Sequence, residues 1–582
     1  MPELLYVPSQ EFARLDQLKL DAAARTRLFA TFCRINTLYM IARAGSGHIG
    51  SSFSSLDIVS WLYLNEIQPA DLYFSSKGHD VPGLYAVLIG LGILPFENIH
   101  ALRRLGGLPG HPDVATPGIV TNTGPLGMGV SKAKGMAFAN RLQGTPGRIY
   151  VLTGDGELQE GQFWESLPSA ANGGLGEITA IVDHNKVQSD TYVKSVSDLG
   201  DLKAKFLAFG WEVARCDGHD FAALQRVLKR FRKITDRPKI LIADTVKGAG
   251  VSFMQHTAMG PQDRFYRFHS GAPDDEAYAR AAAELITSAN AQLAAISAAS
   301  LRTESSPRPE RPPTAGAQRM VVAYSSELLR QAEKEPRLVA LDADLELDCG
   351  LIPFRERFPE RYVECGIAEQ DMVSQAGGMA LRGLLPVVHS FACFLTTRAN
   401  EQIYNNATER RKVVYVGSLA GLLPSGPGHS HQSVRDIAAL GNVPGLVALE
   451  PSCQEEVALA VDYCLNGTPE SCYLRLVSIP CQVPYQLPAG YRLQEGRGAV
   501  LTDGDDAILF GYGPVLLPQA YAAAATLKAE HGLGLSVINF PWLNRVDDSW
   551  LRRTLGDRRH VFTLDNHYVH GGQGQLIAAR TA

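Results

Sequence analysis

Short runs of apolar, often β-branched residues alternate with longer amphipathic stretches along most of this 582-residue chain. The short runs read as strands and the longer stretches as helices. Strands that are apolar throughout and alternate with helices are typical of parallel sheets covered on both faces. The sequence therefore predicts an α/β fold built from doubly wound parallel sheets. The strand-like runs are GRIYVLTG (147–154), EITAIVD (177–183), KILIADTV (239–246), RLVALDAD (337–344), KVVYVGS (412–418) and DAILFGYG (506–513).

One segment, residues 300–318, breaks this pattern because it is rich in Pro, Ser, Thr and Arg. We expect it to run extended over the surface as a linker, with nothing that could pack into a core. It separates a first domain at residues 1–299 from a second at residues 319–485. Two more strand-like runs, LGLSVINF and HVFTLDN, predict a third domain at residues 490–582 with a mixed sheet. Because the sequence stops soon after GGQGQLIAAR begins a helix, we expect this third domain to be shortened.

Composition narrows the class of protein. A net charge of −5 argues against nucleic-acid binding, which usually requires a basic face. The nine cysteines show neither metal-ligand nor disulfide-framework spacing, as is typical of a reducing compartment. The sequence shows no secretory signal pattern and no apolar run of about 18 residues, so we expect no membrane span. A cytoplasmic enzyme is the resulting expectation.

The strongest chemical signal lies in residues 147–187. An apolar strand ends in Gly154-Asp155-Gly156, and a helical segment follows. A second apolar strand then ends in Asp183-His184-Asn185. Asp155 and Asn185 then lie at the carboxyl ends of two strands, where open α/β sheets bind ligands. Their oxygens suit Mg²⁺ or Ca²⁺, and the glycines let a bulky anion approach the backbone. A bare GDG is more often an ordinary turn, so this metal–diphosphate anchor depends on the wider pattern.

That wider pattern, GDGELQEGQFWES followed by IVDHN, resembles the thiamine diphosphate signature in the form found in transketolases. The resemblance extends from about residue 30 to residue 582. It implies that Asp155, Asn185 and the main-chain carbonyl of Val187 hold Mg²⁺, or alternatively Ca²⁺, and that the metal holds the cofactor's diphosphate.

Four further motifs of the first domain match the family and place histidines in its active site. The resemblance implies that these side chains serve the cofactor or transfer protons to and from carbonyl and hydroxyl oxygens, the usual task of imidazole. A lone histidine is more often structural, but here each one lies in its own matching motif. The loop TGPLGMG (123–129) matches the segment that contacts the diphosphate and thiazolium, with Gly124 and Leu126. The histidines are His48 in GSGHIG, His79 in SSKGHD, His111 in PGHPD and His269 in FHSGAP.

In the second domain, RYVECGIAEQDM resembles the family's most telling acidic motif. The resemblance implies that Glu369 hydrogen-bonds the aminopyrimidine ring of the cofactor and promotes loss of the thiazolium C2 proton. For this role it should be partly buried. Phe391 and Phe394 in HSFACF fit an aromatic pocket for the pyrimidine, although core packing could also explain them. GHSHQ places His431 as a further catalytic histidine.

Other acids extend the resemblance. Asp344 in LDADLE matches a cofactor-side acid, and Glu160 and Glu165 match acids that link the two active sites of a dimer in the family. In transketolases the diphosphate anchor and the pyrimidine glutamate come from different subunits. The resemblance therefore implies a homodimer with active sites at its interface.

The substrate side departs from the family. Transketolases bind a sugar phosphate through basic and hydroxyl side chains. This chain lacks two of those cations and has one additional anion, which disfavours binding of a phosphate dianion. We therefore expect a non-phosphorylated substrate, or one whose phosphate lies elsewhere, as in a nucleotide- or carrier-linked sugar. At five positions this chain has a different residue from the family: Ser325 instead of an arginine, Asp348 instead of a serine, Leu419 instead of a histidine, Leu476 instead of an arginine, and Pro427 instead of an acid that contacts a substrate hydroxyl. If the alignment shifts by one residue, Arg475 takes the place of Leu476 and the arginine is kept.

Three functions remain open from the sequence. The leading one is transfer of a two-carbon ketol unit from a ketose to an aldehyde. The second is decarboxylation of a 2-oxo acid such as pyruvate with transfer of the acyl unit, which Pro427 makes credible. The third is a catalytically silent scaffold, which the retained Asp155, Asn185 and Glu369 argue against. The short third domain also leaves room for an additional partner chain.

Overall fold

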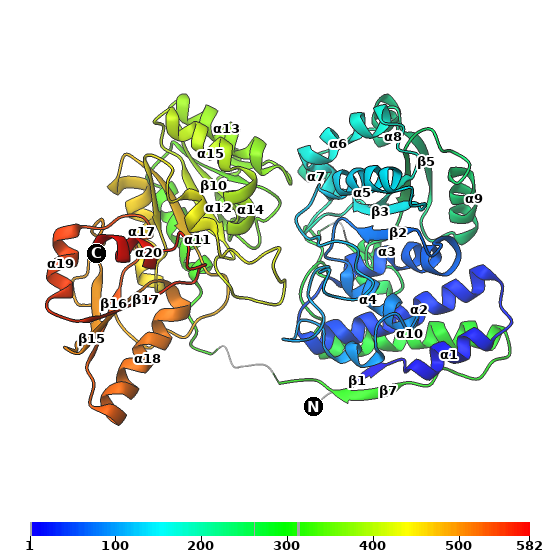
Figure 1. Ribbon diagram of the computed structural model, residues 1–582, viewed down its shortest axis with the longest axis horizontal. Coiled ribbons are helices and arrows are strands. Elements are labelled where there is room, and N and C mark those ends of the chain that lie inside the picture. The colour runs from blue at the N-terminus through cyan, green and yellow to red at the C-terminus, as the bar shows by residue number, and fades with distance from the viewer. Residues whose placement is uncertain (1–2, 261, 311–314, 582) are drawn as a thin grey trace. The chain divides into compact units, whose positions relative to one another are not determined.

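The computed structural model describes residues 3–260, 262–310 and 315–581 (Figure 1). Part of the expected linker, residues 311–314, therefore lies outside the described residues. The chain divides into a first unit, Met1–Arg311 with Gly426–Ser430, and a second unit, Pro312–Ser425 with His431–Ala582. None of the helices in the described ranges is long and apolar enough to cross a membrane.

The first unit is built around a five-stranded parallel sheet with the order β2-β3-β4-β6-β5 (Figure 1). Its central strands are three of the apolar runs predicted from sequence, and they are apolar on both faces because helices cover both. Val151 and Val182 face one core cluster, whereas Leu152 and Ile181 face the other. The strands are β2 (Leu72–Ser75), β3 (Ile149–Gly154), β4 (Ile178–His184), β5 (Glu212–Asp217) and β6 (Lys239–Asp244).

Each face of this sheet has its own helical layer. One layer contributes Phe53, Tyr85 and Leu285 to the larger core, and the other contributes Val130 and Phe163 to the smaller core. The first layer comprises α2 (Ala22–Ala44), α3 (Ile49–Trp61), α4 (Val81–Gly90), α9 (Phe221–Phe231) and α10 (Asp275–Ala295). The second comprises α5 (Gly129–Gln143), α6 (Gly161–Asn172) and α8 (Leu202–Ala208).

The start of the expected linker is ordered against the first unit, which corrects the expectation that nothing in it packs. Leu301 belongs to the larger core of that unit. A strand of the linker, β7 (Glu304–Pro307), pairs antiparallel with β1 (Glu3–Tyr6). The hydroxyl of Tyr6 donates to Glu304 at 2.7 Å, which ties the two strands together through their side chains. The segment is extended, as expected, but its partner lies about 300 positions earlier in the chain and could not be found from local composition.

The second unit contains a six-stranded parallel sheet with the order β12-β13-β11-β10-β8-β9. β9 and β10 lie on opposite sides of β8, so the strand order reverses at β8, and ligands of such sheets bind at this kind of switch point. The strands are β8 (Leu338–Asp342), β9 (Tyr362–Glu364), β10 (Leu385–Phe391), β11 (Val414–Ser418), β12 (Leu446–Leu449) and β13 (Ser471–Arg475). One face packs on α11 (Met320–Ala332) and α17 (Gln454–Asp462), the other on α13 (Glu369–Leu381), α14 (Ala392–Arg398) and α15 (Asn400–Thr408).

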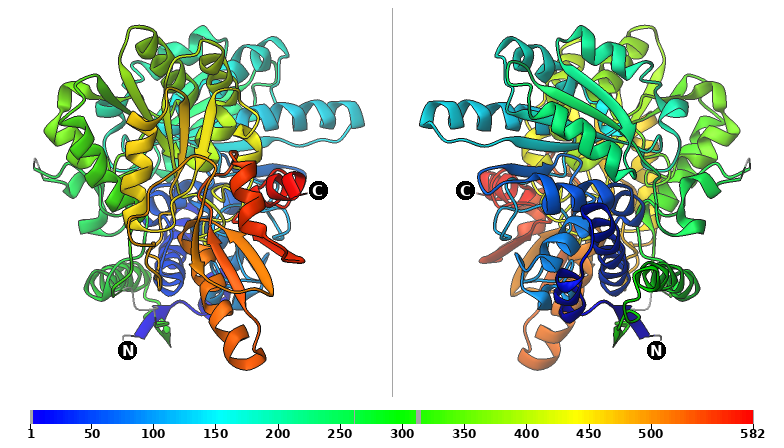
Figure 2. Two further views of the ribbon diagram at one scale, coloured as in Figure 1. Left: turned by 90° about the vertical axis from the view of Figure 1, so that its left-hand side faces the viewer. Right: turned by 90° about the vertical axis from the view of Figure 1, so that its right-hand side faces the viewer.

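The C-terminal part of the second unit forms a four-stranded sheet with the order β14-β16-β15-β17. β14 is antiparallel to β16 and the other pairs are parallel, so the predicted mixed sheet is confirmed. Phe510, Phe540 and Trp542 share one core with Leu449 of β12 and Val457 of α17. The ribbon of this C-terminal part, orange to red, lies next to the yellow ribbon of the preceding sheet (Figure 2, left). The elements are β14 (Ala499–Thr502), β15 (Ala507–Gly511), α18 (Gly513–His531), β16 (Leu535–Asn539), α19 (Asp548–Leu555), β17 (His560–Leu564) and α20 (Gln573–Thr581).

Arg475, the last residue of β13, joins these two sheets through a buried ion network. Its Nε donates to Asp436 at 2.7 Å, its Nη1 donates to Glu450, and its Nη2 donates to the carbonyl of Asn566 at 2.8 Å. The side chain of Arg475 is fully buried. All of its nitrogens therefore bond within the protein. Even if the alignment is shifted by one residue so that Arg475 matches the family's arginine, this side chain is not available to a substrate.

Replacing Arg475 by Met should destabilise the second unit, because it would leave the buried carboxylates of Asp436 and Glu450 without their cation. Breaking a buried ion pair on one side costs about 3–5 kcal/mol. We expect a loss of that size in the unfolding free energy, measured by urea denaturation followed by circular dichroism. Arg497→Met, which removes an exposed ion pair with Asp547, is the matched control and should shift the urea midpoint far less. Equal shifts in the two variants would contradict the structural role of Arg475.

Candidate active site

Four predicted histidines of the first unit converge from four separate segments of the chain. The ring centroid of His48 lies 5.1 Å from that of His79, 5.3 Å from that of His269 and 6.0 Å from that of His111. The rings of His79 and His269 are 5.5 Å apart. Burial lowers the pKa of all four imidazoles, that of His111 to about 3, so the rings are neutral near neutral pH. A cluster of neutral imidazoles can both accept and donate protons without introducing charge.

The two predicted metal-ligand side chains are brought together by the pairing of β3 with β4. Asp155 follows β3, and its Oδ2 accepts a hydrogen bond from the backbone N–H of Lys186, next to Asn185. The Oδ1 of Asn185 accepts from the backbone N–H of Val187 at 3.1 Å. Burial raises the pKa of Asp155 to about 6. A divalent cation would supply the positive charge that this buried carboxylate needs, so the donor set fits Mg²⁺.

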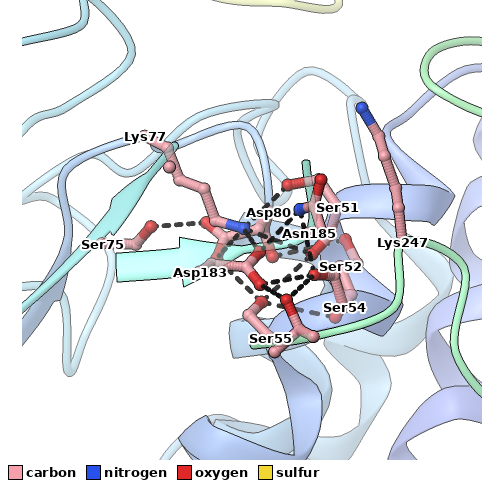
Figure 3. Close-up of polar contacts among 12 residues, drawn as sticks. Ser51, Ser52, Ser54, Ser55, Ser75, Lys77, Asp80, Asp183, Asn185 and Lys247 are labelled. Carbon is pink, nitrogen blue, oxygen red and sulfur yellow. Dashed lines mark hydrogen bonds and ion pairs between the residues drawn. The ribbon is translucent and has the colours of Figure 1, made fainter. Parts of the chain in front are cut away.

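A buried ion pair behind the anchor fixes the orientation of Asn185 (Figure 3). The Nζ of Lys77 lies 2.6 Å from Asp183 Oδ2, and both side chains are almost completely inaccessible to solvent. The amide nitrogen of Asn185 donates to Asp183 at 3.3 Å and to Ser54 at 3.2 Å. Both amide hydrogens are thus used within the protein, which leaves the amide oxygen as the ligand atom.

A second buried lysine, Lys247, lies beside the third predicted metal ligand. Its Nζ donates to the carbonyl of Val187 at 3.1 Å and to the carbonyl of Gln188, and it lies 3.1 Å from His269 Nδ1. Figure 3 shows its side chain extending away from the Asp183 cluster. Both ammonium groups are bonded within the protein, so they place positive charge near the anchor without offering a free donor edge. Sequence reasoning missed Lys77 and Lys247, although a lysine within three residues of the end of an apolar strand is a usable signal, since buried lysines need a partner.

Glu157, another residue that the sequence analysis did not single out, holds the predicted diphosphate loop in place. Its carboxylate accepts from the backbone N–H of Gly127 at 2.8 Å and from that of Gly154 at 3.1 Å. Within this loop Gly124 has φ 135°, a conformation that favours glycine, and Leu126 is half-buried. The loop and the GDG turn are therefore joined through one buried carboxylate.

In the second unit the predicted pyrimidine-side residues also lie together. Glu369, the first residue of α13, is 2 % exposed, and its Oε1 accepts from Arg398 at 2.7 Å. Its Oε2 is buried and has no hydrogen-bond partner within the described ranges. The ring of Phe394 lies 5.8 Å from that of Phe391 and 5.1 Å from that of His431. A buried carboxylate oxygen without a partner beside aromatic rings fits the aminopyrimidine of thiamine.

Arg398 is a residue of this pocket that sequence reasoning missed. Its guanidinium lies 4.4 Å from the centroid of the Phe394 ring, in a cation–π contact, while it donates to Glu369. It follows Phe394 by four positions on α14, one helical turn, and this spacing was the available signal.

The remaining predicted acids have different environments. Asp344 is buried, has φ 60°, and its backbone N–H donates to Glu364 at 3.0 Å. Burial raises the pKa of Glu364 to about 7. Glu160 is buried at the start of α6, whereas Glu165 is exposed on the same helix. Within the described residues of either unit these acids form no cluster with metal-ligating geometry.

The substrate-side departures carry no cation. Ser325 donates to the carbonyl of Gly350 at 2.5 Å, and Asp348 is exposed after β8. Leu419 has φ 55° at the end of β11. The carbonyl of Pro427 lies 2.6 Å from His111 Nδ1, so that nitrogen carries the proton and donates. The proline thus replaces a side chain by a backbone acceptor that sets the tautomer of His111.

Family models cover most of the chain. The thiamine diphosphate-binding domain of transketolase matches residues 25–261, its pyrimidine-binding domain matches residues 317–477, and its C-terminal domain matches residues 496–582. The chain belongs to the transketolase family. It is a transketolase-like transferase, and the predicted α/β architecture with several parallel sheets is confirmed.

Curated relatives agree with this assignment. The chain is 28% identical to transketolase from Rattus norvegicus over 583 residues, which cover 97% of this chain and 91% of the relative. It is 28% identical to transketolase-like protein 2 from Mus musculus over 598 residues, which cover 97% and 92%. A shorter match of 237 residues is 38% identical to 6-deoxy-6-sulfo-D-fructose transketolase subunit SqwG from Clostridium sp. (strain MSTE9) and covers 39% of this chain and 86% of that protein.

Lys77→Met should weaken cofactor binding without removing a predicted ligand, because Asp183 would lose the cation that holds it against Asn185. Removing a partner that orients a metal ligand typically costs about 10- to 100-fold in affinity. We expect a rise of that size in the dissociation constant of thiamine diphosphate at fixed Mg²⁺, measured by isothermal titration calorimetry. The exposed Lys203→Met is the control and should leave the constant unchanged. Wild-type affinity in a folded Lys77→Met protein would show that Asn185 does not depend on this ion pair.

Proposed function

We propose that this protein binds thiamine diphosphate with Mg²⁺ and transfers a two-carbon ketol unit from a ketose donor to an aldehyde acceptor. The observation that carries the proposal is the coexistence of two half-sites. The first unit has the anchor at Asp155 and Asn185 and the histidine cluster. The second has a buried Glu369 oxygen that finds no partner among the described residues, together with two phenylalanines. A catalytically silent scaffold would not need both.

The chain's own residues then have distinct tasks. When bound, thiamine diphosphate supplies the carbon nucleophile that attacks the ketose carbonyl. Asp155, Asn185 and the Val187 carbonyl would hold the metal, and Lys247 would face the diphosphate. The Oε2 of Glu369 would accept or donate a hydrogen bond at the aminopyrimidine.

The histidines would handle the protons of the sugar. Since burial keeps the rings of His48, His79 and His269 neutral, each can take a proton from a ketose hydroxyl and return one to the aldehyde oxygen. His431 lies beside Phe394 and would act from the pyrimidine side. We further propose a homodimer with active sites at its interface, the arrangement that the family resemblance implies.

The donor we propose is a ketose without the usual terminal phosphate. Support comes from Ser325, Asp348 and Leu419, which provide no cation, and from Arg475, whose guanidinium is buried in an ion network. A relative named for 6-deoxy-6-sulfo-D-fructose suggests a sulfonated ketose as one member of this class.

A donor panel should separate the candidate functions. With glyceraldehyde as acceptor, we expect transfer from 6-deoxy-6-sulfofructose or an uncharged ketose. The kcat/KM of this donor should be at least about tenfold above that of xylulose 5-phosphate, because the phosphate would lack a cation and the loss of one charged hydrogen bond costs about a factor of ten. Mass spectrometry of the products is the measurement. A clear preference for xylulose 5-phosphate would contradict the proposed substrate class, and CO₂ release from pyruvate would favour the decarboxylating alternative. Absence of turnover with no rise in thermal midpoint at millimolar cofactor would favour a scaffold.

Two substitutions should separate the half-sites. Glu369→Gln removes the acid but preserves its shape, so we expect turnover to fall by about 100-fold or more, the usual contribution of a positioned proton-transfer group, with cofactor affinity largely retained. Asp155→Ala should instead raise the dissociation constant of the cofactor, because it deletes a metal ligand. Calorimetry and steady-state rates measured on both proteins check this difference. Wild-type turnover in both variants would refute the site assignment.

A further inference from the structure

Arg103 lies beside the histidine cluster, on a short loop before His111. Its Nη1 donates to Ser46 Oγ at 3.0 Å, two residues before His48. A Cβ added at Gly110 would lie 2.9 Å from its Nε, so the glycine leaves room for the guanidinium. The charge of Arg103 contributes to the lowered pKa of both His48 and His111. The guanidinium therefore faces the two loops that carry these histidines.

The unused part of this guanidinium is its bidentate edge. Nε and Nη2 are both buried, and neither has a hydrogen-bond partner among the residues that the structure describes. These two nitrogens present parallel N–H groups on one side of the planar fork, the geometry that matches two oxygens of a carboxylate, phosphate or sulfonate. A buried donor without a partner costs free energy, and more so when it is charged. An oxyanion would supply hydrogen-bond acceptors for both Nε and Nη2.

The backbone conformation and the charge of Arg103 also favour a role in binding an anion. Arg103 has φ 56°, a left-handed conformation that is uncommon for arginine and is held by the hydrogen bond from its N–H to the carbonyl of Leu108 at 2.7 Å. Burial lowers the pKa of Arg103 to about 10, so the group stays cationic near neutral pH. Lys77 and Lys247 are by contrast bound to Asp183 and to backbone carbonyls.

We propose that the Nε–Nη2 edge of Arg103 binds an oxyanion of the substrate, and that the matching group is a monoanion such as a sulfonate. This inference rests on the proposed ketol transfer and narrows its substrate class to a sugar with a singly charged terminus. A phosphate monoester carries about 1.5 to 2 negative charges near neutral pH, whereas one guanidinium among neutral imidazoles balances only one. Arg103 would thus supply a cation for the substrate, whereas Ser325 and Leu419 supply none.

The test compares Arg103→Gln with Arg104→Gln in the full chain loaded with thiamine diphosphate and Mg²⁺. Arg104 is the matched control because it is adjacent and exposed, and its side chain donates only to the Arg43 carbonyl, at 3.4 Å, among the contacts described. The probes are 3-hydroxypropane-1-sulfonate, glycerol 3-phosphate and the neutral 1,4-butanediol, titrated by ligand-observed NMR. We expect the wild type and Arg104→Gln to bind the sulfonate at least about tenfold more tightly than the diol, and Arg103→Gln to lose this preference.

Several outcomes would overturn the proposal. These are equal sulfonate affinity in Arg103→Gln and Arg104→Gln, or no preference of the wild type for the sulfonate over the diol. Tighter binding of the phosphate than of the sulfonate would overturn the monoanion assignment. If Arg103→Gln does not fold, Arg103→Lys tests the same proposal. This variant keeps the positive charge but loses the paired N–H groups, so it should weaken sulfonate binding severalfold. The binding readout needs no turnover, so it separates this inference from a failure of the proposed ketol transfer, which would appear as no product from any ketose.

Discussion

The parallel pairing of β3 with β4, which sets Gly154 opposite Asp183, is the constraint on which the rest of the site depends. This register places Asp155 and Asn185 on adjacent turns at one edge of the sheet. A slip of one residue would turn Asp183 to the other face and away from Lys77. The buried ion pair between Lys77 and Asp183 therefore does two things: it opposes the slip, because separating the charges is costly, and it orients the amide of Asn185.

The electrostatics of the two units are complementary in kind. The first unit combines buried cations with imidazoles that burial keeps neutral, which suits an anionic cofactor tail and proton transfer at uncharged sugar oxygens. The second unit combines buried acids with aromatic rings, which suits a ring that carries hydrogen-bond donors. Several buried polar atoms of the described residues have no protein partner, and two sets of them lie at the candidate site: Glu369 Oε2 in the second unit, and Nε and Nη2 of Arg103 in the first. Atoms of this kind cost stability in the folded chain, and at these two places a bound ligand can supply the missing hydrogen bond.

The parts of the fold and site that could be predicted from sequence are those carried by local pattern. The apolar runs that became β3, β4 and β6, and the GDG turn with its Asp155, depend on neighbours within a few residues. What could not be predicted depends on partners far apart in the chain. Arg475 is buried only because Asp436 and Glu450 reach it, and β7 pairs with β1 across the whole first unit. The role of Arg103 depends on which of its donors are already used, and local sequence does not report this.

In the proposed site, moving one cation from the family's phosphate positions to Arg103 would change the preferred substrate without changing the reaction. A site that binds a dianion needs at least two charge-assisted contacts, since each uncompensated buried charge is expensive. Arg475 cannot provide one of them while it holds Asp436 and Glu450 together, and Asp348 adds a charge of the wrong sign at another family position. Arg103 alone balances a single negative charge, and the imidazoles around it remain neutral and add hydrogen bonds without adding charge. In the proposed reaction the chemistry at the carbonyl would depend on the histidines and Glu369, which this substitution pattern leaves in place. Under this proposal, selectivity between terminal anions would be decided by the net charge at Arg103, a position separate from the residues proposed to move protons.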